Sequence, residues 1–187
     1  MKKYLLPSIK LTLLLVLLLA VVYPALIAAV AKLAPGGGKG KTVSVNGKVV
    51  GYENVGQQFT ADKYFQGRPS AVNYNAAGSA GSNKGASNPD YQKTVQERID
   101  TFLAHNPGIK KEDIPAELVT ASGSGLDPDL SPAAALVQVK RVAAVRGISE
   151  QKLVALVTEH IQGPLMGIAG PSKVNVLKLN IALDTLK

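Results

Sequence analysis

The hydrophobic pattern divides the chain into an apolar N-terminal stretch and a longer region of mixed character. Residues 11–31, 21 positions in all, contain no charged side chain. A helix of this length is about 31 Å long, which is enough to cross a hydrocarbon core of about 30 Å. The pattern therefore predicts one transmembrane helix. Pro24 is expected to kink this helix or to end its regular part.

A cleaved signal peptide is the alternative interpretation of the same stretch, because Ala29-Val30-Ala31 resembles a cleavage site. The apolar region of a signal peptide is only about 7–15 residues long, so the greater length here favours a retained anchor. Lys2 and Lys3 favour a cytoplasmic N-terminus, and large domains cross the membrane largely regardless of their charge. With either interpretation, the remainder of the chain is exported.

Three regions follow from this division. Residues 1–33 are predicted to form a cytoplasmic tip and the anchor, and residues 34–41 a flexible Gly/Lys linker. Residues 42–187 are predicted to form one soluble extracytoplasmic domain, which begins with a β-hairpin around Asn46-Gly47. Asn-Gly favours a hairpin because both central residues of the tight turn need positive φ.

Further along the chain, the apolar spacing changes to that of helices. Asn88-Pro89 has the residues of a helix start, and Asn106-Pro107-Gly108 those of a stop. Between them an apolar stripe recurs every four residues, at Tyr91, Val95, Ile99 and Leu103.

Two more helix starts are predicted in the last third of the chain, at Ser131-Pro132 and at Ser149. The first of these helices is expected to present Leu136, Val139, Val142 and Ala143 on one face, and to end at Gly147. The chain ends with apolar residues that alternate between 174 and 183, which suggests a strand, although a final helical turn fits equally well. The expected fold class is α+β.

Two long polar loops, residues 66–90 and 120–131, have no regular period. Phe59, Tyr64, Phe65 and Tyr74 lie before and within the first loop, and we expect them to pin it to a core. The small residues of both loops allow close backbone packing. Loops on a rigid scaffold also often carry function, so a contact surface for a membrane partner is equally compatible with the pattern.

Composition excludes several classes of site. The chain contains no cysteine, which rules out disulfides, thiolate metal sites and cysteine nucleophiles. The net charge of +8 is concentrated at the start, because residues 1–48 hold seven lysines and no acid. Residues 49–187 hold 14 basic and 13 acidic residues, a net charge of +1, so the basic patch expected of a nucleic-acid-binding domain is absent.

Three local motifs resemble reactive or binding sites but fail in their context. Gly40-Lys41-Thr42 has the end of a phosphate-binding loop, but Pro35 replaces the required first glycine and a hairpin follows. The spacing of Asp127 and Asp129 resembles a calcium loop that lacks its central glycine and its final glutamate. Neither histidine has further ligands at metal spacing, and a packed structural role is expected for His160.

The two loops, in this order behind one anchor, resemble the C subunit of the Kdp potassium-transporting P-type ATPase. Loose and close matches to that family run along the chain: Gly56-Gln57-Gln58-Phe59, Phe65-Gln66-Gly67-Arg68-Pro69-Ser70, Ser79 to Gly85 with Ala80 in place of a glycine, Ser87-Asn88-Pro89, Thr120 to Pro128, Ser131-Pro132, Gln138, Arg141-Val142, Val174 to Leu177, and Leu179-Asn180. Lys84 and Gly163-Pro164 are further small departures from the family pattern.

The resemblance implies a non-catalytic accessory subunit of a potassium-importing complex in a bacterial inner membrane. In that family a channel-like subunit carries the ion, a P-type subunit hydrolyses ATP, and the C subunit is needed for a stable and active assembly. It has been described as a catalytic chaperone that raises the ATP affinity of the hydrolysing subunit. An exported domain does not meet cytoplasmic ATP, so we expect no bound cofactor here and an effect on ATP only through the complex. We also expect no metal site, because the histidines have no further ligands at metal spacing.

The residues expected to contact the partner subunits lie in the two loops. They are Gly67, Arg68, Pro69, Ser70, Ser82 and Asn83 in the first loop, and Ser122, Gly123, Ser124, Gly125 and Asp127 in the second. Two other functions stay open from the residues alone. One is a membrane-tethered exported binding module, and the other is a hydrolase in which Ser122 or Ser124 works with His160, although no nucleophile elbow is present.

Overall fold

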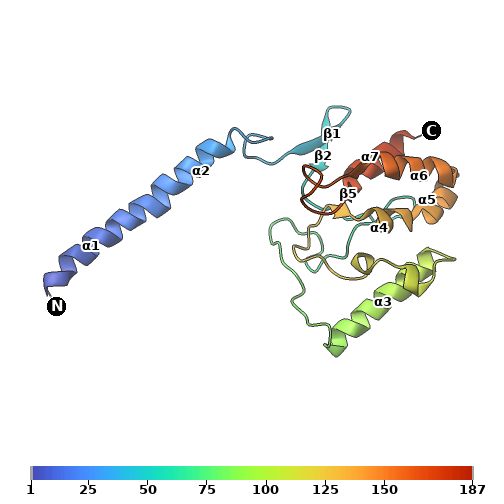
Figure 1. Ribbon diagram of the computed structural model, residues 1–187, viewed down its shortest axis with the longest axis horizontal. Coiled ribbons are helices and arrows are strands. Elements are labelled where there is room, and N and C mark those ends of the chain that lie inside the picture. Colours follow the sequence, from blue (N-terminus) through green and yellow to red (C-terminus); the bar gives the residue numbers. More distant parts are fainter. Residues whose placement is uncertain (1, 187) are drawn as a thin grey trace. The chain divides into compact units, whose positions relative to one another are not determined.

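A computed structural model describes residues 2–186 and divides the chain into two compact units, one up to Thr42 and one from Val43 onward. The first unit contains the apolar segment as one continuous helix in three parts, α1 (Lys2–Leu17), η1 (Leu18–Val22) and α2 (Tyr23–Ala31) (Figure 1). The stretch Lys3–Ala31 is long and apolar enough to span a membrane.

The interruption predicted at Pro24 takes the form of a widened turn. The η1 segment is a π-helical turn in which the Tyr23 N–H donates to the Leu18 carbonyl, five residues back. Proline has no N–H, and its ring crowds the carbonyl four residues before it. A π turn relieves that crowding while the helix continues to Ala31.

The second unit opens with the predicted hairpin. Strands β1 (Thr42–Val45) and β2 (Lys48–Tyr52) form a two-stranded sheet, and both Asn46 and Gly47 have positive φ. A hairpin after Lys41 confirms that no phosphate-binding helix starts there. A long irregular segment then leads to α3 (Pro89–His105), which has the predicted bounds and an Asn88 side chain that accepts from the Tyr91 N–H.

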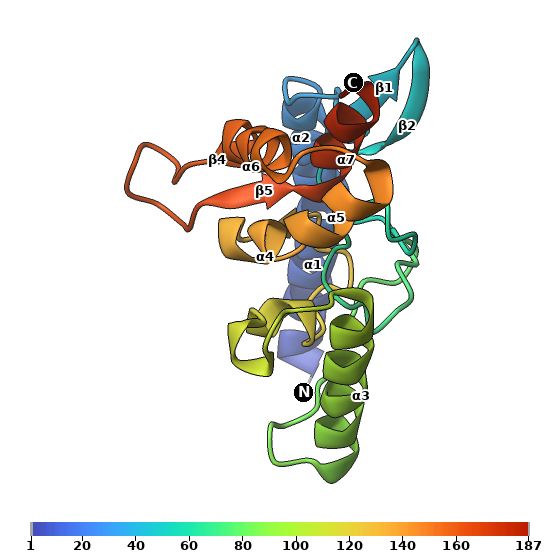
Figure 2. The ribbon, with the colours of Figure 1, turned by 90° about the vertical axis from the view of Figure 1, so that its right-hand side faces the viewer.

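The compact part of this unit is built from the C-terminal third. Helices α4 (Pro132–Leu136), α5 (Val139–Arg146), α6 (Glu150–Glu159) and α7 (Val176–Thr185) pack around a small antiparallel sheet of order β3-β5-β4. The strands are β3 (Asp129–Leu130), β4 (Ile161–Gln162) and β5 (Lys173–Asn175). Figures 1 and 2 show α3 on the far side of this unit from α6 and α7, beyond the 3₁₀ turns η2 (Lys111–Asp113) and η3 (Ala116–Leu118).

In this region the structure corrects one sequence prediction and decides between two alternatives that the sequence left open. The single helix expected from Ser131 to Gly147 is broken at Val137 and Gln138, and Leu136 is exposed while Val139, Val142 and Ala143 are buried. The C-terminal strand ends at Asn175, whose side chain caps α7 by accepting from the Lys178 N–H at 3.1 Å. From Val176 onward the apolar residues belong to the helix α7, which is buried on most of its surface.

One main core and one smaller core hold this unit together. Phe65 is fully buried in the main core, which includes side chains from α4, α5, α6, β5 and α7. The smaller core, Leu118, Leu130, Ala134 and Val176, is joined by Phe102, through which α3 is attached. Burial of a side chain as large as Phe65 contributes roughly 1.5–3 kcal/mol, so the aromatic residue does pin the first loop to the core as predicted.

Candidate interaction site formed by two interlocked loops

The segment that leads into the first loop is held by two amide side chains in place of a partner strand. The Asn180 amide accepts from the Phe65 N–H and donates to the Phe65 carbonyl, both at 2.9 Å. On the next residue, Gln138 accepts from the Gln66 N–H at 2.8 Å and donates to its carbonyl at 3.0 Å. Both amides are buried, so they satisfy backbone groups that water does not reach.

The two predicted loops then meet along a line of hydrogen bonds. The Ser70 hydroxyl donates to the Gly125 carbonyl at 2.6 Å, and the Ser122 N–H donates to the Pro69 carbonyl at 3.1 Å. Further along, the Ser79 hydroxyl donates to the Ser124 carbonyl at 2.9 Å. Residues about 45 to 55 positions apart in the sequence thus form one interlocked structure.

Glycine is required where the loops cross. Gly125 has φ +67°, and a Cβ there would lie 2.6 Å from the Val72 side chain and 2.8 Å from the Ala80 carbonyl oxygen. A Cβ at Gly81 would lie 2.9 Å from the Gly123 carbonyl oxygen. The small residues of these loops therefore serve close backbone packing, one of the two roles that the sequence left open.

An ion pair and a half-buried tyrosine complete the junction. Arg68 Nη1 lies 3.1 Å from Asp127 Oδ2, with both side chains about a quarter exposed, and Asp127 Oδ1 accepts from the Asp129 N–H. The Tyr74 hydroxyl donates to the Arg68 carbonyl. Burial, and secondarily the negative charge of Asp127, raise the pKa of Tyr74 above its ordinary value of 10.0, so the hydroxyl stays a donor at neutral pH.

The predicted contact residues fall into three groups by exposure. Ser122 and Gly125 are buried, and the half-buried ones are Gly67, Arg68, Pro69, Ser70 and Asp127. Ser82, Asn83, Gly123 and Ser124 are exposed, and they form the outer rim of the interlocked loops. Only the rim residues, together with the half-buried ones, present surface to another molecule.

A groove of about 390 Å³ adjoins this junction. The first loop contributes Gly67, Arg68, Pro69 and Tyr74, and the facing side of α3 contributes Thr94, Glu97, Arg98 and Thr101. Arg98 Nη1 donates to the Val119 carbonyl at 3.1 Å, which ties α3 to the start of the second loop. The sequence did not predict that α3 forms a wall of the site.

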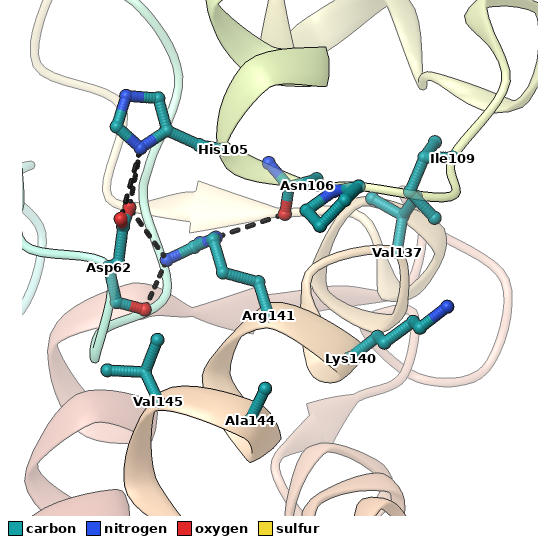
Figure 3. Close-up of a pocket in the computed structure, with 10 residues that line it drawn as sticks. Asp62, His105, Asn106, Ile109, Val137, Lys140, Arg141, Ala144 and Val145 are labelled. Atoms are coloured by element: carbon teal, nitrogen blue, oxygen red, sulfur yellow. Dashed lines mark hydrogen bonds and ion pairs between the residues drawn. The ribbon is translucent and has the colours of Figure 1, made fainter.

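A buried arginine of α5 links the segment before the first loop to the helices, and the sequence did not identify it as a site residue (Figure 3). Arg141 donates from Nε to the Asn106 side chain at 3.0 Å and from Nη2 to Gln138 at 2.7 Å, and Nη1 reaches the Tyr64 carbonyl at 3.1 Å. Its pKa is lowered by burial, and the nearby charge of Asp62 opposes that shift. The only sequence signal was its place in the family pattern.

His105 lies at the rim of the same cluster. Its Nδ1 is 2.9 Å from Asp62 Oδ1, while Arg141 Nη1 is 3.8 Å from the same oxygen (Figure 3). These residues line a cavity of about 210 Å³ whose other walls are mostly apolar. Within residues 2–186 no group of three or more His, Asp or Glu side chains is arranged to hold a metal ion.

The serine and histidine of the hydrolase alternative are engaged elsewhere. Nδ1 of His160 lies 2.8 Å from the Leu156 carbonyl at the end of α6, which is the structural role expected for it. Ser124 Oγ accepts from the Leu126 N–H at 3.1 Å. Ser122 is buried against the first loop. The structure therefore gives no support to a pairing of Ser122 or Ser124 with His160.

Comparison with known proteins decides between the alternatives. The model of the family described as K+-transporting ATPase, c chain (KdpC) matches residues 5–185. The chain belongs to the KdpC family. A potassium-transporting ATPase KdpC subunit from Flavobacterium psychrophilum is 62% identical over 96% of each chain. Those from Flavobacterium johnsoniae and Bacteroides fragilis are 58% and 53% identical, over 99% of this chain and 100% and 98% of theirs.

The interlocked loops lie within the part of the chain that matches the KdpC family. The matched residues include the apolar helix, both loops and α7, so the resemblance found in the motifs extends through the whole architecture. A binding module for a soluble ligand and a serine hydrolase find no support in these matches.

Proposed function

We propose that this chain is a non-catalytic accessory subunit of an ATP-driven potassium import complex, needed for its assembly and activity. The observation that carries this proposal is the family match over residues 5–185. In addition, the small residues of the two loops pack against each other and do not form a reactive site with His160. The partners are the channel-like subunit and the ATP-hydrolysing subunit of the same complex.

In this proposal the helix Lys3–Ala31 anchors the chain in the inner membrane with its N-terminus in the cytoplasm. The domain then lies on the extracytoplasmic face and acts as a clamp on the outer mouth of the channel-like subunit. The exposed rim residues Ser82, Asn83, Gly123 and Ser124 are candidates for that contact. Loops pre-organised by internal hydrogen bonds lose little entropy on binding, which favours a stable assembly.

The effect on ATP turnover is indirect in this arrangement. A domain outside the membrane has no access to cytoplasmic ATP, so it can act only by changing the stability of one conformation of the assembled complex. The chain itself needs no cofactor and no metal for that role.

Topology and assembly test the proposal separately. A reporter that is active only outside the cytoplasm, fused after residue 187, should be active, whereas a reporter that is active only inside should be silent. The intact chain should co-purify in mild detergent with the other subunits when all are expressed together. Activity of the inside reporter would overturn the placement of the domain, and a chain that stays alone would overturn the accessory role.

A further inference from the structure

The loop between β4 and β5 carries the most exposed apolar side chains of the second unit. Leu165 is 71% exposed, and Met166 and Ile168 are each 89% exposed. The ten residues 163–172 contain no charge. Figure 2 shows this loop projecting beyond β5 and α6. Exposed apolar side chains that are contiguous at one tip indicate a surface that is covered in the working assembly.

The tip is an ordered hairpin end. Leu165 and Ala169 exchange two backbone hydrogen bonds, of 2.8 Å and 3.0 Å, and the Ile168 N–H donates to the Leu165 carbonyl at 3.2 Å. At its base, β4 and β5 are paired in the sheet. The backbone hydrogen bonds thus fix the turn, and its three apolar side chains stay exposed to solvent.

The turn holds a methionine in a conformation that favours glycine. Met166 has φ +54° and is followed by Gly167 at φ +77°. A left-handed conformation costs free energy for a residue with a Cβ, and within this chain the Met166 side chain gains little burial in return. Burial of the Met166 side chain against another molecule would offset the cost of this backbone conformation.

The chemistry of the tip favours a protein pocket over a lipid surface. Segments that insert into bilayers combine apolar side chains with aromatic residues at the interface and with Lys or Arg beside them. Residues 163–172 contain neither. Lys173, the basic residue that follows directly in the sequence, is paired with Asp129 at 2.6 Å. Methionine and aliphatic side chains adapt to apolar pockets at protein interfaces.

We propose that Leu165, Met166 and Ile168 plug an apolar pocket on a companion subunit of the same ATPase. This inference rests on the proposed function, because it takes its partner from the complex. This apolar contact would be separate from the contact proposed for the polar rim of the interlocked loops, because it is made by the turn between β4 and β5.

The absence of cysteine makes the test direct, because a single introduced thiol is unique in the chain. Met166→Cys is compared with Val154→Cys, a control on the exposed face of α6. Each full-length variant is labelled with a water-soluble maleimide, alone in detergent, alone in liposomes, and within the purified complex. We expect Cys at 166 to react at least tenfold more slowly only within the complex, while the control reacts at a similar rate throughout.

Each outcome supports or overturns the plug. Protection of residue 166 in liposomes without the other subunits would assign the tip to lipid and overturn the proposal. Equal labelling at 166 inside and outside the complex would also overturn it, while leaving the accessory role intact. A wild-type chain that does not assemble would instead count against the proposed function.

A second variant separates loss of the plug from loss of the fold. Met166→Gly combined with Ile168→Ser removes two exposed side chains and relieves the positive-φ position, so the Tm should not fall. Co-purification with the companion subunits should drop several-fold. Recovery of the complex at the wild-type level would show that the tip is dispensable.

Discussion

At the scale of single residues, the junction of the two loops depends on positions where a side chain has no room. Gly125 combines a positive φ with two close neighbours, the Val72 side chain and the Ala80 carbonyl. Gly123, two residues earlier in the same loop, has open space where its Cβ would be. Substitutions at these two positions therefore distinguish the effect of a steric clash from the effect of losing a glycine.

We expect Gly125→Ala to destabilise the domain by about 1–3 kcal/mol, because the new methyl group forces the loops apart in a strained conformation. Gly123→Ala should change the free energy of unfolding by less than about 0.5 kcal/mol. Thermal unfolding of both variants, followed by circular dichroism, measures the difference. Equal Tm values for the two would contradict the interlocked packing.

Gln138 is the second residue on which the site depends. Its amide pairs with both backbone groups of Gln66 and also accepts from Arg141. Gln138→Ala leaves these buried groups without partners and should cost about 2–4 kcal/mol. Denaturant unfolding measures this, with Gln96→Ala on the exposed side of α3 as the control. A loss no larger than that of the control would show that water replaces the amide at no cost.

At the scale of elements, α3 is the least firmly packed helix of the second unit. None of its residues is buried, and it is held by Phe102 and by side-chain bonds at Arg98 and Asn106. Its start depends on the Asn88 cap, which satisfies a backbone N–H that lacks an intrahelical partner.

Asn88→Ala should therefore destabilise α3 by about 1 kcal/mol and increase its local opening. Hydrogen exchange of the α3 amides should become roughly fivefold faster, while the amides of α6 keep their rates. An Asn88→Ser variant, which restores a capping oxygen, should recover most of the protection. Unchanged exchange in α3 would mean that tertiary contacts alone hold its first turn.

At the scale of the whole molecule, the chain joins an apolar helix to a domain that has its own cores. The main and smaller cores are made of residues after position 58, and no residue of the first helix contributes to them. Independent folding of the second unit is the expected consequence.

A fragment of residues 43–187 should thus be soluble and should unfold within about 3 °C of the domain in the full chain, because its apolar core is complete. It should fail to co-purify with the other subunits at the level of the full chain, because it lacks the anchor. Circular dichroism and co-purification give the two readouts. A fragment without a cooperative transition would show that the anchor is needed for folding.

The sequence correctly predicted those helix starts and turns that are formed by residues close together in the chain. The caps at Asn88, Ser131 and Ser149 and the Asn46-Gly47 turn are present as predicted, because each involves residues within four positions of each other. The length of the apolar segment likewise needed no tertiary information. The break after Leu136 was not predicted. The choice between a strand and a helix at the C-terminus stayed open, because alternating apolar residues fit both periods when an element is buried on most sides.

What the sequence determined by itself was the membrane-spanning length, most helix starts, the α+β class and, through its motifs, the family. What only the tertiary structure decided was which loop residues face inward. Ser70 meets Gly125 across 55 positions, and Phe65 meets Asn180 across 115. Neither pairing leaves a periodic trace in the sequence, because a hydrogen bond between irregular segments depends on the path of all the chain between them.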